Sequence, residues 1–140
     1  MSMNSTVGTT LVVRQQWHLP STELSVRSLR HGLRAVLDDS GVAADDLNDL
    51  LLAACEAATN AIEHAQEPSQ PFFDVLVEGH DGDVTIVVHD HGRWRDGPVG
   101  PYRGRGLQMM RALADTTITS RPQGTTVTMR HSPTDAGLGG

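Results

Sequence analysis

The stretch EAATNAIEHA, from Glu56 to Ala65, sets an acid, an amide and an imidazole among small apolar residues. These three side chains, Glu56, Asn60 and His64, follow one another at intervals of four. On a helix, residues four apart lie one above the other, so the three would project from one strip beside the buried face. If that strip faced water it would be an ordinary solvated helix edge, so its chemistry depends on what the rest of the chain supplies.

Two further segments supply polar groups that suit a nucleotide. The apolar run VTIVVHDHG ends in Asp90 and then Gly92, at a place where an unpartnered carboxylate would be costly to bury. The segment GRGL, Gly104 to Leu107, stands at a predicted helix start, where free N–H groups and the helix dipole favour an anion. An acid, an amide, a second acid and a glycine-flanked helix start are parts from which a nucleotide site can be built.

The elements that must position these groups follow from periodicity and turn residues. The sequence predicts a strand over 9–17, helices over about 20–41 and 44–65, a hairpin over 71–92 turning at Asp81-Gly82, a loop over 91–103, a helix over 106–115 and a final hairpin over 116–132. This order predicts an α+β two-layer sandwich in which helices cover one face of a mixed, mainly antiparallel sheet. We expect one domain over 9–131, a disordered N-terminus over 1–8 and a flexible tail over 132–140.

The composition of the chain argues against two classes of protein, those that bind nucleic acids and those that span membranes. The formal charge is -6 and no basic cluster is present, which argues against a nucleic-acid surface because phosphate neutralisation supplies most of such affinity. No segment approaches the roughly 18 apolar residues that a membrane span requires, so we expect a soluble, cytoplasmic protein. The single Cys55 cannot form an internal disulfide, and the seven histidines show no zinc-site spacing.

Four motifs in this order resemble those of the GHKL superfamily of ATP-binding domains, which share the Bergerat fold. Within it, the chain is most similar to the small anti-sigma-factor serine kinases. EAATNAIEH resembles the N box, VHDHG the first glycine box, GRGL the second, and GTTVTM the terminal strand motif. The resemblance covers about Leu11 to His131.

The resemblance implies a role for each residue of the first two motifs. Glu56 would be the base that accepts the proton of a substrate serine, and Asn60 would coordinate Mg2+. Asp90 would accept a hydrogen bond from the adenine amine, and Gly92 would let the base approach the backbone. His64 would line the phosphate end of the site, although a structural histidine would fit the sequence equally well.

The remaining nucleotide-binding residues implied by the resemblance lie in the second half of the chain. The phosphates would be met by the second glycine box, namely Gly104, Arg105, Gly106 and Leu107. Thr125 would complete the adenine pocket, although alternating threonines are also ordinary in a strand. The first glycine box departs from the family pattern, because Trp94 stands where a second glycine is common.

Two functions from different classes follow. In the first, the chain is an ATP- and Mg2+-dependent serine kinase that phosphorylates a STAS-type anti-anti-sigma protein, with a sigma factor as second partner and a homodimer as one assembly. In the second, it is a nucleotide-dependent anti-sigma binding module with little turnover. Glu56 favours the kinase, because a pure binder has no need of a base there. The short loop between the two glycine boxes favours the binder.

Overall fold

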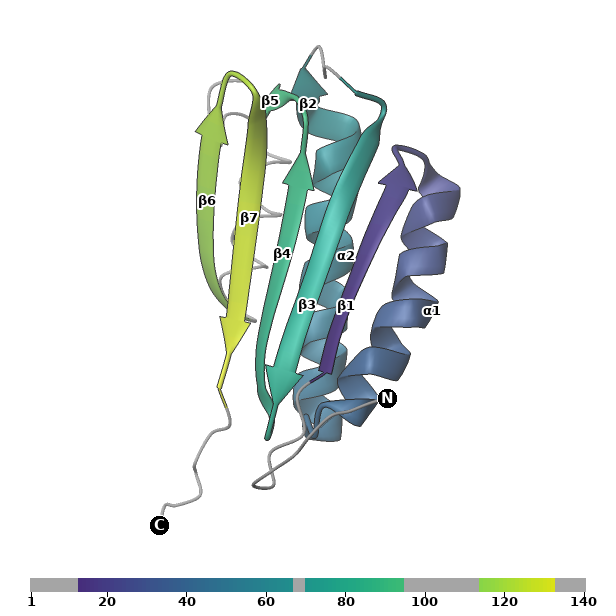
Figure 1. Cartoon of the computed structure of the whole chain (residues 1–140), viewed down its shortest axis with the longest axis vertical. Coiled ribbons are helices and arrows are strands. Elements are labelled where there is room, and N and C mark those ends of the chain that lie inside the picture. The colour runs from purple at the N-terminus through teal and green to yellow at the C-terminus, as the bar shows by residue number, and fades with distance from the viewer. Residues whose placement is uncertain (1–12, 67–69, 95–113, 133–140) are drawn as a thin grey trace.

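The computed structural model describes residues 13–66, 70–94 and 114–132. Within them, two helices cover one face of a five-stranded sheet (Figure 1). In chain order the elements are β1 (Val13–Pro20), α1 (Glu23–Asp39), α2 (Ala44–His64), β2 (Ala65–Gln66), β3 (Phe72–His80), β4 (Asp83–Asp90), β5 (Arg93–Trp94), β6 (Asp115–Arg121) and β7 (Gly124–His131). The predicted α+β sandwich is confirmed.

The large sheet has the strand order β1-β3-β4-β7-β6, so β4 lies at its centre. Every pairing between these five strands is antiparallel. The sheet is therefore antiparallel throughout the described residues, in line with the mainly antiparallel sheet that the sequence predicts. In a strand, side chains alternate between the two faces, so one face of this sheet meets the helices while the other is open.

Helix α1 begins and ends where the sequence indicates. The Thr22 hydroxyl accepts a hydrogen bond from the Ser25 backbone N–H, which satisfies one of the free donors of the first turn. At the other end, the Ser40 hydroxyl donates to the Leu37 carbonyl at 2.9 Å. Gly41 follows with φ +84°, a conformation that glycine adopts without a steric penalty, and this stops the helix.

The hairpin between β3 and β4 turns at Asp81-Gly82, as predicted. The two residues have φ 53° and 81°, the positive pair that a two-residue turn needs to match the twist of its strands. The Gly82 N–H donates to the Ser40 carbonyl at 2.9 Å, so the turn is also tied to the end of α1.

The core lies between the helices and the inner face of the sheet. It combines leucines of α1, small residues of α2 and β-branched residues of the central strands; fully buried members include Leu29, Leu33, Leu37, Leu50, Ala54, Ala58, Phe73, Val75, Val77, Ile86, Val88, Val127 and Met129. The alanines of α2 let that helix approach β4 and β7 closely. Among the described residues, no helix is long and apolar enough to span a membrane.

The structure differs from the predicted elements in three places. The first strand continues to Pro20 rather than ending at Trp17, because Pro20 pairs with Phe72 and the Ser21 N–H donates to the Pro71 carbonyl. The predicted 44–65 helix ends at His64, since Ala65 enters β2. The predicted loop over 91–103 contains strand β5. The predicted helix over 106–115 lies mostly outside the described residues, as does the predicted tail over 132–140, and the predicted N-terminus over 1–8 lies wholly outside them.

Candidate functional site

The strip of α2 that carries the acid and the amide does not face open water. Glu56 is half-buried, and Asn60, one turn later, is only 3% exposed. The interpretation of this strip as a solvated helix edge is therefore wrong for Asn60. His64 is the last residue of the helix, and its side chain lies outside the described part of the structure.

The buried amide of Asn60 is incompletely satisfied. Its Nδ2 is buried and makes no hydrogen bond to any residue that the structure describes. Leaving a buried donor unpaired costs about 1–3 kcal/mol, so such atoms call for an explanation. The two ends of an amide can exchange by rotation, so this side chain can turn either a donor or an acceptor to an incoming group.

A short two-stranded pairing joins the end of α2 to the end of β4. Ala65 pairs with Trp94 and Gln66 with Arg93, antiparallel, through β2 and β5. Figure 1 shows β2 and β5 side by side at the edge where β4 ends and α2 ends. The pairing brings the helix with Glu56 and Asn60 to the turn after Asp90, about 30 residues further along the chain.

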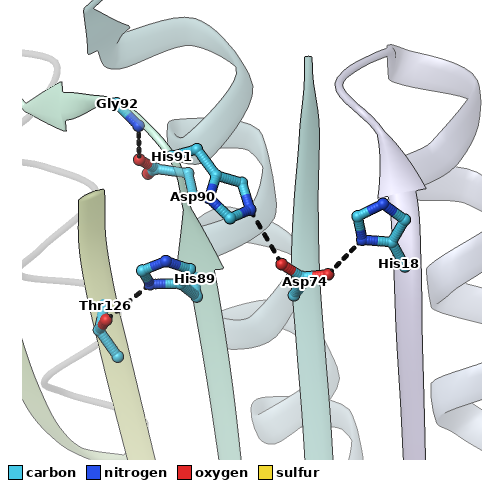
Figure 2. Close-up of polar contacts among 7 residues, drawn as sticks. All are labelled: His18, Asp74, His89, Asp90, His91, Gly92 and Thr126. Carbon is cyan, nitrogen blue, oxygen red and sulfur yellow. Dashed lines mark hydrogen bonds and ion pairs between the residues drawn. The ribbon is translucent and has the colours of Figure 1, made fainter. Parts of the chain in front are cut away.

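The turn that follows β4 is held by hydrogen bonds on its inner side. Asp90 is 3% exposed, and its Oδ1 accepts from the Gly92 N–H at 2.9 Å (Figure 2). Thr125, fully buried on β7 opposite Asp90, donates its hydroxyl to the Gly92 carbonyl at 3.2 Å. The Ser120 hydroxyl of β6 lies 3.0 Å from that of Thr125. Both backbone groups of Gly92 are thus fixed by side chains from two strands, and one of these side chains, Thr125, is itself contacted from a third.

Gly124 allows β7 to pass this turn, and the sequence did not single it out as a site residue. A Cβ at this position would lie 2.4 Å from the Asp90 carbonyl oxygen and 2.8 Å from Cε1 of His89. Any side chain would push β7 away from the end of β4. A glycine that opens a β-branched strand was the signal available in the sequence.

On the opposite, open face of the sheet, the two histidines beside Asp90 make separate contacts. His89 Nδ1 lies 2.8 Å from the Thr126 hydroxyl, and His91 Nε2 lies 3.0 Å from Asp74 Oδ2 (Figure 2). Both imidazoles therefore lie on the face of the sheet opposite the Asp90 carboxylate. Asp74 was missed, because nothing near it in the sequence indicates a partner 17 residues away.

Asp74 also contacts a histidine of the edge strand. His18 Nδ1 lies 2.5 Å from Asp74 Oδ1, so each carboxylate oxygen meets one imidazole. Burial raises the pKa of the Asp74 carboxyl, but the hydrogen bonds and positive charge of His18 and His91 outweigh it, and the pKa lies below its usual value. Asp74 therefore stays ionised at neutral pH.

Two hollows of the described structure lie elsewhere, on the outer side of the helix layer. A groove of about 310 Å³ between α1 and α2 is lined by Glu23, Val26, Arg27, Arg30, Cys55, Thr59, Ile62 and Glu63. It includes neither Asn60 nor Asp90, and we do not assign the nucleotide to it. Cys55 borders this groove, and burial raises the pKa of its thiol, so it is a weak nucleophile at neutral pH.

The described side chains include the kinds of ligand and hydrogen-bond acceptor that Mg2+ and ATP require. Asn60 offers a neutral oxygen suited to Mg2+, which proteins hold with few side chains because substrate phosphates complete its shell. The described residues contain no group of three or more His, Cys, Asp or Glu able to hold a metal. The buried Asp90 carboxylate accepts a hydrogen bond from the Gly92 N–H, and a carboxylate is the kind of acceptor that an adenine amine requires. The predicted phosphate residues Gly104, Arg105, Gly106 and Leu107 lie outside the described part.

Comparison with known proteins places this arrangement in a family. Residues 19–131 match a family described as "Histidine kinase-like ATPase domain". The chain belongs to this family. It is 27% identical to the serine-protein kinase RsbW of Staphylococcus epidermidis, over 81% of this chain and 83% of that protein. The same kinase of Staphylococcus aureus is 26% identical over the same shares of the two chains.

A solved structure shows the same fold. The crystal structure of the RsbU and RsbW domains of Rv1364c from Mycobacterium tuberculosis superimposes with a TM-score of 0.69 at 27% identity. The match covers 84% of this chain but only 31% of that longer protein. These findings confirm the predicted superfamily, its fold and the likeness to anti-sigma serine kinases.

Proposed function

We propose that this chain is an ATP-dependent protein serine kinase of the anti-sigma type. The observation that carries the proposal is the buried Asn60 amide with its unsatisfied Nδ2, one helical turn after Glu56. A buried amide with no complete set of partners is costly unless a bound group completes it. In an ATPase domain, a phosphate oxygen of the nucleotide would accept from this N–H, and the oxygen of the same amide would hold Mg2+.

Asp90 and Gly92 would receive the adenine. The carboxylate accepts a hydrogen bond from the exocyclic amine, and its burial excludes the water that would compete for that bond. Thr125 fixes the Gly92 carbonyl and so keeps the turn in place before the base arrives. Mg2+ held by Asn60 would neutralise charge on the phosphates. His64 and the second glycine box would surround the phosphate end.

Glu56 would act on the protein substrate. It lies on the same strip as Asn60, so its carboxylate can receive the proton of a serine hydroxyl that approaches the γ-phosphate. The serine oxygen then forms a bond to phosphorus while the bond to the bridging oxygen of ADP breaks. ADP leaves with the electron pair of the broken bond, and the proton taken up by Glu56 passes to solvent, so no covalent intermediate forms on this chain.

The substrate class we propose is a STAS-type anti-anti-sigma protein, with a sigma factor as the second partner. The support is the likeness to proteins named serine-protein kinase RsbW, and the M. tuberculosis protein in which an RsbW domain occurs together with an RsbU domain. With these partners and ATP as substrate, the chain would act in the cytoplasm. A homodimer would be compatible with this role.

The decisive experiment is incubation of the purified chain with labelled ATP, Mg2+ and candidate STAS proteins. Wild type should transfer phosphate to one of them. Glu56→Gln keeps the side-chain shape and removes the base, so transfer should fall roughly 10²- to 10⁴-fold while ATP affinity stays nearly unchanged.

The matched control is Asp49→Asn, which removes another acid of α2 at an exposed position. It should phosphorylate at the wild-type rate. Equal transfer by Glu56→Gln and wild type would disprove the role of Glu56. Tight ATP binding with no transfer to any partner would instead favour the binding module.

A further inference from the structure

The open face of the sheet carries a carboxylate held between two imidazoles. Asp74 of β3 contacts His18 of β1 through one oxygen at 2.5 Å and His91 through the other at 3.0 Å (Figure 2). His18 and Asp74 are direct register partners, whereas His91 lies just beyond β4 and reaches back across the sheet. The group therefore links three segments that are remote in sequence.

His91 connects the Asp74 carboxylate to the proposed nucleotide site. It is the middle residue of the turn between Asp90 and Gly92, whose inner side is fixed by the Asp90–Gly92 and Thr125–Gly92 bonds. The His91–Asp74 bond holds the same turn from the outer side. Hydrogen bonds therefore hold the turn from both faces of the sheet. Asp74, on the outer face, cannot contact a nucleotide that binds on the inner face.

We propose that Asp74 is a positioning residue for nucleotide binding, acting through His91 on the orientation of Asp90. The inference rests on the proposed function, since it concerns the same site. Loss of the His91–Asp74 bond would remove one of the contacts that hold this turn, so the Asp90 carboxylate would be held less firmly in the orientation that the adenine amine needs. Ordering of the turn would then reduce the net free energy of binding, so ATP would bind more weakly.

The contact to His91 matters more than the contact to His18. The His91 side chain is 17% exposed, whereas that of His18 is 57% exposed and lies on the edge strand. Exposed ion pairs contribute little, because water and salt screen them. His18 also stacks on Phe72 at 4.6 Å, so its position does not depend on Asp74 alone. Its role would be to orient the carboxylate.

The test compares Mg2+-ATP dissociation constants of Asp74→Ala, His91→Phe and the double variant by calorimetry. His91→Phe keeps a ring and removes the donor. Each single variant should bind roughly 3- to 30-fold more weakly, as expected for loss of one charge-assisted hydrogen bond, and the double variant should be no worse than either. Asp74→Asn keeps an acceptor and should recover part of the loss. His18→Ala should have a smaller effect than either single variant.

Glu78→Ala is the matched control, because it removes another β3 carboxylate that pairs with β1, through Arg14 at 2.8 Å. It should leave ATP affinity unchanged. Unchanged affinity in Asp74→Ala, or additive losses in the double variant, would overturn the inference, as would failure of both single variants to fold. Absence of ATP binding by the wild type would instead disprove the proposed function.

Discussion

The two ends of β4 satisfy their polar groups in different ways. At its start, the Asp81-Gly82 turn needs only backbone: its positive φ angles close the hairpin, and the Gly82 N–H finds the Ser40 carbonyl. At its end, the turn at Gly92 is held by the side chains of Asp90 and Thr125, and the Ser120 hydroxyl of β6 contacts that of Thr125. The first end therefore uses backbone groups alone, whereas the second depends on side chains, one of them 33 residues further along the chain.

We interpret the first end of β4 as structural and the second as part of the proposed nucleotide site. Asp90 and Thr125 are buried polar residues, and Asn60 keeps an unsatisfied donor on the helix that meets this end. Burying such groups costs stability, and folded proteins tolerate that cost mainly where function requires the groups. We therefore predict that substitutions at the end of β4 will weaken ATP binding, whereas equivalent substitutions at its start will leave ATP affinity unchanged.

The largest difference is expected from removal of the aspartates that end and begin β4. Asp90→Ala should weaken ATP binding by about 1–3 kcal/mol or more, because the adenine amine loses a charged acceptor, and Asp90→Asn should be intermediate. Asp83→Ala, at the start of the strand, should leave ATP affinity unchanged. Calorimetric titration of the three variants checks this, and equal affinities would remove Asp90 from the site.

The glycines at the two ends offer a second comparison. Gly124→Ala places a methyl group against the Asp90 carbonyl, so it should lower the free energy of unfolding by about 1–3 kcal/mol and also weaken ATP binding. Gly82→Ala forces a positive φ on alanine and should cost about 1–2 kcal/mol of stability alone. Denaturant unfolding and ATP titration distinguish the two. Wild-type ATP affinity in Gly124→Ala would show that the fit of β7 is not needed for binding.

Replacement of Asn60 should preserve or raise stability while it removes the Mg2+ dependence of ATP binding. Asn60→Leu removes the unsatisfied donor at similar volume, so it should be as stable as wild type or more stable by about 1 kcal/mol. ATP binding should at the same time lose its dependence on Mg2+, measured with and without a chelator. Asn48→Leu, an exposed amide of the same helix, should change neither property. Persistent Mg2+ dependence in Asn60→Leu would mean that the ion is held elsewhere.

The smallest expected effect is the contribution of Asp74 to the pH dependence of the unfolding free energy. Because its pKa in the folded protein lies below the ordinary value of 3.8, Asp74 stabilises the fold above that pH, and the contribution is lost as the pH falls through the folded pKa. The difference in unfolding free energy between wild type and Asp74→Asn should therefore shrink as the pH is lowered from about 5 to 2.5. Denaturation at several pH values checks this, and a constant difference would show that Asp74 is not stabilised by its two histidines.

The sequence by itself determined what depends on near neighbours. Helical periodicity and the Thr22 cap placed α1, Asp81-Gly82 placed the hairpin, and the order of four motifs identified the family. It also selected Glu56, Asn60 and Asp90 as candidate site residues. These features are legible because propensity, capping and turn geometry act over only a few residues.

Only the tertiary structure decided how these pieces meet. The burial of Asn60, the β2–β5 pairing, the hydrogen bond from Thr125 to Gly92 and the contact of Asp74 with His91 all join residues that are distant in sequence or depend on such packing. Strand order and register set these contacts, and a single sequence records neither directly. The candidate residues were readable from local pattern, whereas the network that holds them in place exists only once the sheet has formed.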